Sequence, residues 1–289
     1  MSGIYLGTSA FTAAGWPGTF YPAGMQPRDY LGFYSTKFDT VEVDSTFYRC
    51  PSKDMVSNWG LRTTEGFLLS SKVPKTITHE KILLDCDAEF ETFVDTMDIL
   101  DEKLGPMVFQ FPYFNKEIFQ SDVQFLSRLK VFLKKLPQDY RFAVEIRNKH
   151  WLRPKFLDLL REHNVALVLQ DQSWMPRPAE LFERFDPITA DFTYLRWLGD
   201  RKGIETVTKT WDKVVIDREP DLQDWVKVCH QMARRGVTVF GYANNHFAGH
   251  APATIQLFRE MCERDGISVP IQVHLPEPFD RTLFENSAN

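Results

Sequence analysis

The sequence predicts an α/β protein built as a (β/α)8 barrel, with a single domain over residues 1–289. Eight short apolar runs with β-prone residues alternate with longer segments of helical period. Strands that alternate with helices pair in parallel, because each return to the same end of a sheet needs a crossover. A doubly wound sheet is the alternative, but no GxGxxG or GxxxxGKS/T phosphate loop follows any of the runs.

The eight predicted strands are short and rich in Val, Ile, Leu and Phe. They cover residues 4–9, 40–46, 67–72, 107–111, 141–147, 165–171, 192–198 and 237–244. Between them, two clear stripes of apolar side chains keep helical spacing. The stripes are Phe90, Phe93, Val94, Met97, Leu100 and Leu104, and then Phe125, Leu126, Leu129, Phe132, Leu133 and Leu136.

Residues that favour helix ends support this order of elements. Ser52 and Ser121 are predicted N-caps, Pro154 suits a first helical turn, and Gly236 and Gly266 end the last two long helices. Two of the connections between predicted strands, residues 172–190 and residues 200–220, are less regular than the others.

Residues 172–190 have room for at most a short helix, and residues 200–220 begin with a charged loop. The C-terminal tail, residues 267–289, contains several prolines, and we expect it to wrap around the outside or to fray.

Composition and charge exclude several classes of function. The net charge of −5 argues against a surface that tracks a polyanion or an acidic membrane, so we expect neither nucleic acid nor membrane as a partner. Four scattered cysteines without a CxxC pair argue against a zinc cage. No leader or long apolar run is visible, which favours a cytoplasmic protein. We expect neither a metal nor a cofactor.

Alternation along the strands predicts which side chains face the barrel interior. In "RFAVEIR", the apolar residues at 142, 144 and 146 suit the helix layer, which leaves Glu145 and Arg147 pointing inward. In "TVEVDST", Glu42 and Asp44 share a face in the same way. Both pairs lie near the C-terminal ends of their strands, where barrel enzymes place their active sites.

The same test adds polar residues from most of the other strands. They are Ser70, Lys72, Gln110, Gln170, Arg196 and Asn244. Burying several charges is costly unless they pair with one another or meet a ligand. A structural ion-pair network of Glu42, Asp44 and Glu145 with the cations is the alternative to a ligand site, although Val and Ile layers would fill a barrel at lower cost.

Loops beyond the strand ends contribute further candidates. Asn244, Asn245 and His246 precede a helix that begins near residues 249–251, where free amides could hold an anion. His246 and His250 are four residues apart, but Gly249 argues against their sharing a helix face as metal ligands.

Aromatic residues follow the first two strands. Trp16, Phe20 and Tyr21 could form a lid or stacking wall over the mouth, or could plug the barrel against water. Phe47 and Tyr48 offer similar rings, for which packing is the simpler expectation. The expected partner is a small-molecule ligand, for which an anion is one candidate.

Seven segments resemble, in order, the motifs of the YecE-like family, known as domain of unknown function 72. They are "IYLGTSAF…GWPGTFYP", "VEVDSTFYRCPS", "SSKVPKTITH", "FQFPYF", "VEIRNKHW", "YLRWLG" and "YANNHFAGHAPATI". The resemblance implies a TIM barrel and brings no established activity. The positions that it implies as characteristic are Glu42, Thr46, Phe47, Tyr48, Lys72, Gln110, Glu145, Arg147, Trp151, Arg196, Asn244, Asn245 and Gly249. This chain has Leu198 where the family has a His, so no role of that His carries over.

Three functions fit these residues. The first is a hydrolase-like enzyme acting on a small anionic or polyhydroxylated substrate, with Glu42, Glu145 and Lys72 as catalytic groups. In its glycosidase version the two glutamates form the acid/base pair. In its phosphoester version the cations stabilise the negative charge that develops during the reaction. A third version uses the lysine to form a Schiff base with the substrate.

The predicted substrate-binding residues come from several strands and loops. They are Arg147, Arg196, Gln110, Gln170, Asn244, Asn245, His246, Tyr48 and Trp16. The second function is a non-catalytic binder or sensor that uses the same pocket. Metal-dependent hydrolysis of nucleic acid, with ligands such as Asp171, ranks last because no HxH spacing is present.

Overall fold

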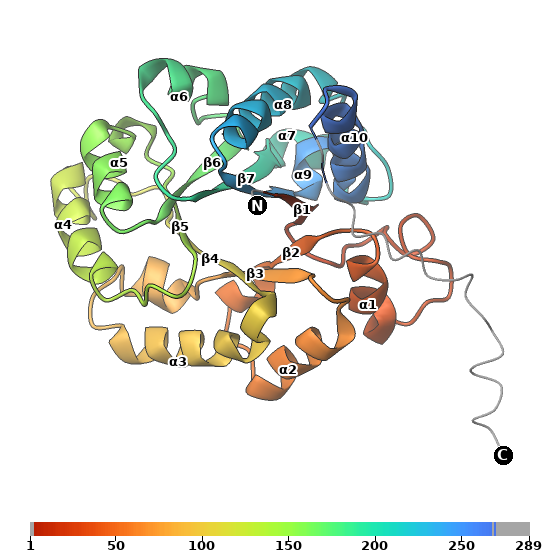
Figure 1. The fold of residues 1–289 in the computed structure, drawn as a ribbon, viewed down its shortest axis with the longest axis horizontal. Helices are drawn as coiled ribbons and strands as arrows, with labels where there is room; N and C mark the ends of the chain where they lie inside the picture. Colours follow the sequence, from red (N-terminus) through yellow and green to blue (C-terminus); the bar gives the residue numbers. More distant parts are fainter. Residues whose placement is uncertain (1–2, 268, 270–289) are drawn as a thin grey trace.

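Eight parallel strands form one sheet, in the order β1-β8-β7-β6-β5-β4-β3-β2. The computed structural model describes residues 3–267 and residue 269. The strands curl into a barrel with helices around the outside (Figure 1), so the predicted (β/α)8 fold is confirmed. They are β1 (Ile4–Thr8), β2 (Thr40–Val43), β3 (Leu68–Lys72), β4 (Leu104–Gln110), β5 (Phe142–Glu145), β6 (Ala166–Gln172), β7 (Phe192–Gly199) and β8 (Thr238–Ala243).

Ten α-helices are present in the described part of the chain. They are α1 (Tyr30–Ser35), α2 (Lys53–Arg62), α3 (Asp87–Met97), α4 (Asp122–Leu133), α5 (Pro154–Arg161), α6 (Pro178–Arg184), α7 (Arg201–Val207), α8 (Glu219–Arg234), α9 (Asn245–Ala248) and α10 (Ala251–Arg264). None of these helices combines the length and the apolar character that a membrane crossing needs.

Most of the predicted helix ends are confirmed. The Ser52 hydroxyl accepts a hydrogen bond from the Met55 amide at 3.3 Å, as an N-cap should. Ser121 occupies the N-cap position of α4, but its side chain makes no capping hydrogen bond. Gly236 and Gly266 follow α8 and α10 with φ of 69° and 75°, a conformation that glycine adopts without strain.

Two expectations about local structure were wrong. The predicted charged loop after β7 contains helix α7, which begins where the Asp200 carboxylate accepts a hydrogen bond from the Lys202 amide. The buried side chain of Ile204 packs this short helix onto the barrel. The apolar stripe that was assigned to one helix through Leu104 breaks after Met97, and Leu104 begins β4.

The barrel closes at a seam between β1 and β2. A Cβ atom on Gly7 would lie only 1.8 Å from the Thr40 carbonyl oxygen, so glycine is required for the two strands to approach. One backbone hydrogen bond crosses the seam, from the Asp39 amide to the Leu6 carbonyl. The Thr8 amide donates instead to the Tyr34 hydroxyl at 2.7 Å, so side chains replace part of the ladder.

Apolar side chains form two separate cores. The larger core lies between the strands and the helices, while the smaller fills the barrel interior. The interior core consists of Val108, Ala143, Ala166, Val168, Phe192, Tyr194, Phe240 and Tyr242. Because these side chains block the barrel below its mouth, a ligand can approach the polar strand ends only from the C-terminal side.

The predicted tail lies almost wholly outside the described residues. Ile267 and Val269 are buried, and they extend the outer core beyond α10.

Candidate active site

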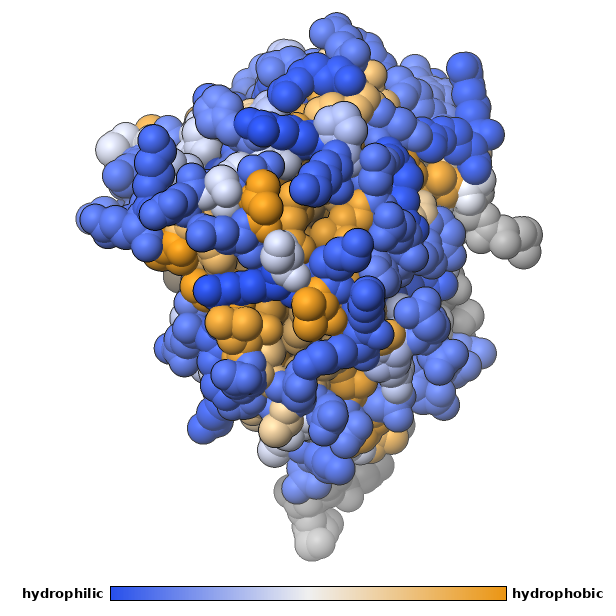
Figure 2. All heavy atoms as spheres, turned by 90° about the vertical axis from the view of Figure 1, so that its left-hand side faces the viewer, coloured by the Kyte–Doolittle hydropathy of each residue, from blue (hydrophilic) through white to orange (hydrophobic). Residues whose placement is uncertain are grey.

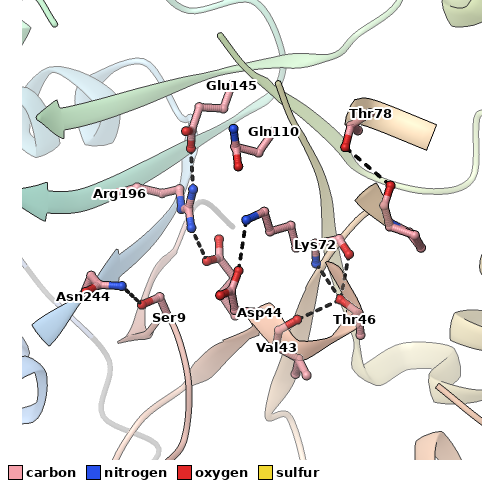
Figure 3. Close-up of polar contacts among 12 residues, drawn as sticks. Ser9, Val43, Asp44, Thr46, Lys72, Thr78, Gln110, Glu145, Arg196 and Asn244 are labelled. Carbon is pink, nitrogen blue, oxygen red and sulfur yellow. Dashed lines mark hydrogen bonds and ion pairs between the residues drawn. The ribbon is translucent and has the colours of Figure 1, made fainter. Parts of the chain in front are cut away.

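Strand register places the predicted polar residues on the inner face. Glu42 pairs with Ser70 across β2 and β3, and Glu145 pairs with Gln110 across β5 and β4. Gln170 pairs in the same way with Arg196 across β6 and β7. Contacts between side chains from distant strands then show that these residues meet at the axis of the barrel (Figure 3).

Arg196 holds the two buried glutamates together. Its Nη2 donates to Glu42 Oε1 at 2.7 Å, and its Nη1 donates to Glu145 Oε2. All three side chains are almost completely buried. Figure 3 shows the Arg196 guanidinium group beside the Glu145 carboxylate, with Asp44 on the side away from Glu145. The space between the two glutamates is therefore occupied by a protein side chain.

Tyrosines from β7 and β8 form the floor beneath this network. The Tyr194 hydroxyl donates to Glu42 Oε2 at 2.5 Å. The Tyr242 hydroxyl lies 2.5 Å from Ser70 Oγ and 2.9 Å from Thr40 Oγ1. These bonds fix the polar layer to the apolar interior below it, so the network is held rigidly.

The two glutamates have pKa values that are displaced in opposite directions. Burial raises the pKa of Glu42, and the attraction of Arg196 only partly offsets this effect. Burial also acts to raise the pKa of Glu145, but Arg196 and Arg147 outweigh it and the pKa is lowered. Two neighbours make the difference: Asp44 repels the charge on Glu42, while Arg147 Nε lies 3.2 Å from Glu145 Oε1 and attracts its charge.

Lys72 ends β3 at the rim of the buried network. Its Nζ lies 3.2 Å from Asp44 Oδ1 and 3.8 Å from the centroid of the Phe47 ring. Burial lowers the pKa of Lys72, and the attraction of Asp44 opposes that shift. Thr46 Oγ1 accepts a hydrogen bond from the Lys72 amide at 3.1 Å, which fixes the strand end.

Asp44 is the one acid of this group that is half-exposed, with 38% of its side chain accessible. Its Oδ1 faces Lys72 but makes no well-aligned hydrogen bond. Strand alternation predicts that Asp44 lies on the inner face, and the charge pattern predicts only that it balances the nearby cations. Because its carboxylate is half-exposed and faces Lys72, Asp44 is a stronger candidate for contact with a ligand than Glu42 or Glu145, which are both buried.

His79 is a further candidate, which the sequence patterns alone did not indicate. It lies in a π-helical turn, Thr76–Glu80, with its Nδ1 2.9 Å from Thr78 Oγ1 and its ring edge-on to Phe47. Burial, with Lys72 and Arg147, lowers its pKa to about 4. The imidazole is therefore neutral at pH 7. The available signal was the "SSKVPKTITH" motif, and π-helical turns are frequent at functional sites.

The side-chain amides of the two predicted glutamines donate to backbone carbonyls, that of Gln110 to the next residue and that of Gln170 to the end of the neighbouring strand. Gln110 Nε2 donates to the Phe111 carbonyl at 2.5 Å, and Gln170 Nε2 donates to the Ile146 carbonyl at 2.7 Å. Gln170 Oε1 is buried without a hydrogen-bond partner among the described residues.

Predicted residues after β8 are bonded mainly to one another. Asn244 accepts a hydrogen bond from the His246 amide at 2.9 Å and donates to Ser9 Oγ at 2.9 Å. Asn245 Oδ1 accepts from the Ala251 amide at 2.9 Å, so the first turn of α10 already has a side-chain cap. His246 Nε2 lies 3.3 Å from Glu205.

The aromatic candidates have different surroundings. Trp16 is 1% exposed and its Nε1 donates to Asn245 at 3.2 Å, so of its two proposed roles it has the packing role. Tyr48 is 68% exposed at the rim. Leu198, at the position where the resemblance implies a His, is half-buried and lies at a register shift between β6 and β7.

Metal ligation has little support in this arrangement. Asp171 lies on the outer face of β6, where it accepts a hydrogen bond from Trp225 Nε1 at 2.8 Å. It is therefore separated from Glu42 and Glu145 by the sheet. Within residues 3–267, no three His, Cys, Asp or Glu side chains come together as a metal site.

Comparison with known proteins identifies the family. Residues 5–278 match the family described as "Protein of unknown function DUF72". The protein named UPF0759 protein YecE, from Escherichia coli K12, is 31% identical over 117 residues, and the match spans only 40% of each chain. UPF0759 protein YunF from Bacillus subtilis is 28% identical over 269 residues, which cover 86% of this chain and 90% of YunF.

A crystal structure supports the same assignment. The DUF72 family protein of Thermotoga maritima is 25% identical and superimposes with a TM-score of 0.70, covering 90% of this chain and 99% of that one. Its similarity extends over the whole barrel. Because the family match also spans most of the sequence, the chain belongs to the DUF72 family.

Proposed function

We propose that the chain is a hydrolase-type enzyme that performs acid–base chemistry on a small anionic or polyhydroxylated substrate at the barrel mouth. The observation that carries the proposal is the pair of Lys72 and Asp44. An ammonium group and a half-exposed carboxylate lie 3.2 Å apart at the C-terminal strand ends, and burial lowers the pKa of the lysine. A lysine with a lowered pKa gives up its proton more readily than an ordinary lysine, which suits a general acid.

The proposed step is hydrolysis of an ester, with phosphoesters as the first choice. Asp44 takes a proton from water as the water oxygen bonds to the phosphorus or carbonyl carbon. Lys72 gives a proton to the leaving oxygen as its bond to that atom breaks. The proton on Asp44 then returns to Lys72, so that the products are one acid and one alcohol and the pair is reset.

The cations around this pair suit an anionic substrate. Arg147 is only partly covered, with 28% of its side chain exposed, and it can face developing negative charge. Arg196, Glu42 and Glu145 act as positioning residues, since their buried ion pairs keep Arg147 and the strand ends in place. The glycosidase version with Glu42 and Glu145 astride the scissile bond has less support, because Arg196 lies between them.

A screen of phosphoester and glycoside libraries tests the proposal. We expect turnover by the wild type and a loss of about 100-fold or more in Lys72→Met and in Asp44→Asn. Lys75→Met is the control, because Lys75 lies three residues after Lys72, beyond the end of β3, is half-exposed and pairs with Glu80. Turnover that persists in both site variants would remove the pair from the mechanism.

A non-catalytic binder or sensor is the second candidate, and one observation favours it. The charges of Glu42 and Glu145 are already compensated by Arg196, so the mouth could hold a ligand without a reactive carboxylate. A thermal-shift screen with product analysis separates the two functions. A compound that stabilises the protein and is recovered unchanged, with no turnover in the libraries, would favour the sensor.

A further inference from the structure

An open cavity of about 390 Å³ lies beside the mouth, between the loop after β4 and the turn after β5. Its lining residues include Tyr113, Lys116, Arg147, Lys149, Trp151 and Trp174. A second cavity of about 340 Å³ shares Lys149, His150 and Trp174 with the first. Trp174 therefore lies at the boundary of two adjoining hollows.

Positive charge dominates the larger cavity. Lys116, Arg147 and Lys149 line it, and no carboxylate is among its lining residues. Neither lysine forms an ion pair with any carboxylate of residues 3–267. Arg147, which lines the cavity, uses its Nε for Glu145, and its terminal nitrogens have no protein acceptor in the described chain. Such a concentration of cations is unusual on a protein of net charge −5.

Aromatic surface accompanies these cations. Trp174 is 46% exposed and Tyr113 is 65% exposed, so both rings offer a free face. Trp151 is held from behind by stacking on Phe125, with ring centroids 5.3 Å apart. Figure 2 shows the side of the molecule that carries α4 and α5, on which apolar side chains (orange) lie among polar ones (blue). In the cavity itself, Tyr113, Trp151 and Trp174 would give a flat ring partners to stack on.

We propose that this cavity binds the ring of a ring-bearing anion, with the ring against Trp174 and the charged group between Arg147 and Lys149. The inference rests on the proposed function for the claim that this ligand is the substrate, since Arg147 belongs to both the mouth and the cavity. The substrate class is then an aromatic or heterocyclic ester of an acid such as phosphate. A neutral sugar would leave the cations without counter-charge.

Three matched probes separate the ring from the charge. 1-Naphthyl phosphate carries both groups, 1-naphthol carries the ring alone, and inorganic phosphate carries the charge alone. Binding is measured by calorimetry, and the indole N–H signals of the tryptophans are followed by NMR. The Lys72→Met protein is used beside the wild type, so that binding is observed without turnover. We expect naphthyl phosphate to bind at least about tenfold more tightly than either fragment.

Variants of exposed residues then locate the site. Trp174→Ala should weaken naphthyl phosphate about tenfold and leave inorganic phosphate unchanged, because only the ring contact is lost. A double change, Lys116→Met with Lys149→Met, should weaken both phosphates and spare naphthol. Lys130→Met is the control, since this exposed lysine on α4 does not line either cavity.

Each outcome bears on one of the two proposals. Equal affinities for the three probes, or a Trp174→Ala protein that binds as the wild type does, would overturn the cavity assignment. Probe binding that depends on Trp174, in a protein with no turnover of any ester, leaves the cavity assignment standing and counts against catalysis. Ester turnover that is lost in Lys72→Met but unchanged in Trp174→Ala supports catalysis and counts against the cavity as the place where the substrate ring binds.

Discussion

The two sides of the barrel mouth use polar residues in different ways. On the side of β2, β3 and β5, Lys72, Asp44 and Arg147 keep charged atoms that the protein only partly engages. On the side of β8 and β1, the amides of Asn244 and Asn245 are occupied by hydrogen bonds to the protein itself. Both sides are polar in sequence, but among the described residues the first side holds the charges that are less completely paired.

This difference teaches that polarity at a strand end is not sufficient to identify a site. A polar group that already has its partners stabilises the loop around it, since an unsatisfied buried group would be costly. A charged group that is held close to others without complete pairing carries a cost that a ligand can relieve. The following predictions test this division, beginning with the largest effect.

Replacing Arg196 by Met should have the largest effect. The change leaves two buried carboxylates side by side without their common cation, so we expect the free energy of unfolding to fall by about 3–5 kcal/mol. Urea unfolding at pH 7 measures it. Lowering the pH should restore part of the loss, because protonation removes the repulsion between Glu42 and Glu145.

Arg147→Met is the matched comparison for this experiment. Arg147 pairs with Glu145 but is partly exposed, so we expect a smaller loss of about 1–2 kcal/mol. Equal stabilities of the two variants would contradict the view that the Arg196 network is the structural part of the mouth and Arg147 the part open to a ligand.

His79 lies on the side of the mouth that holds Lys72, Asp44 and Arg147, and it should make the free energy of unfolding depend on pH. Its pKa is about 4 in the fold, below the ordinary value of 6.5, so the unfolded chain binds the proton more readily. This contribution is fully present above pH 6.5 and is lost as the pH falls toward 4. Because the imidazole is half-exposed, solvent screening reduces the expected effect to about 1–2 kcal/mol.

The measurement compares unfolding free energies of the wild type and His79→Gln at pH 7 and pH 5. The glutamine variant should lose less stability between these two values. If both proteins respond identically, burial beside Lys72 and Arg147 does not lower the pKa of His79 in the folded protein.

Asn245→Ala tests the satisfied side. The change removes the acceptor for the Ala251 amide and for Trp16 Nε1, so we expect a loss of about 1 kcal/mol in unfolding free energy. Binding of 1-naphthyl phosphate should remain as in the wild type. A marked loss of binding in a folded Asn245→Ala protein would move the ligand to the other side of the mouth.

Tyr48→Ala should have the smallest effect on the fold. The side chain is 68% exposed, so we expect less than about 0.5 kcal/mol of change in stability. Any effect on turnover in this variant would then report contact with the substrate rather than loss of structure. Thermal unfolding recorded with steady-state kinetics provides both readings.

Strand alternation was sufficient to predict the architecture and the inward direction of the charges. Parity depends only on the pleat, so Glu42, Glu145 and Arg196 could be placed on one face from the sequence. The short helix α7 escaped notice because its sequence contains Gly203 and few apolar residues, and its stability comes from Asp200 and the packing of Ile204.

Hydrogen-bond partners could not be predicted, since they depend on how loops from distant parts of the chain meet. Trp16 and Asn245 are 229 residues apart in sequence, and nothing local indicates that each satisfies the other. The division between Asp44, which stays half-exposed, and Glu42, which is fully buried, depends on Arg196 and Tyr194 from β7. Such a difference appears only when the barrel has closed.

The seam at Gly7 and Thr40 has a consequence for how the ring of strands opens. Elsewhere the neighbouring strands are joined by backbone ladders, whereas β1 and β2 depend largely on the Tyr34 hydroxyl and the Asp39 carboxylate. Local opening should begin where the fewest main-chain bonds must break. Amide hydrogen exchange should therefore be faster for Leu6 and Thr8 than for the amides of β7. Local opening of the barrel would begin on the side opposite the cavity that Trp151 and Trp174 line.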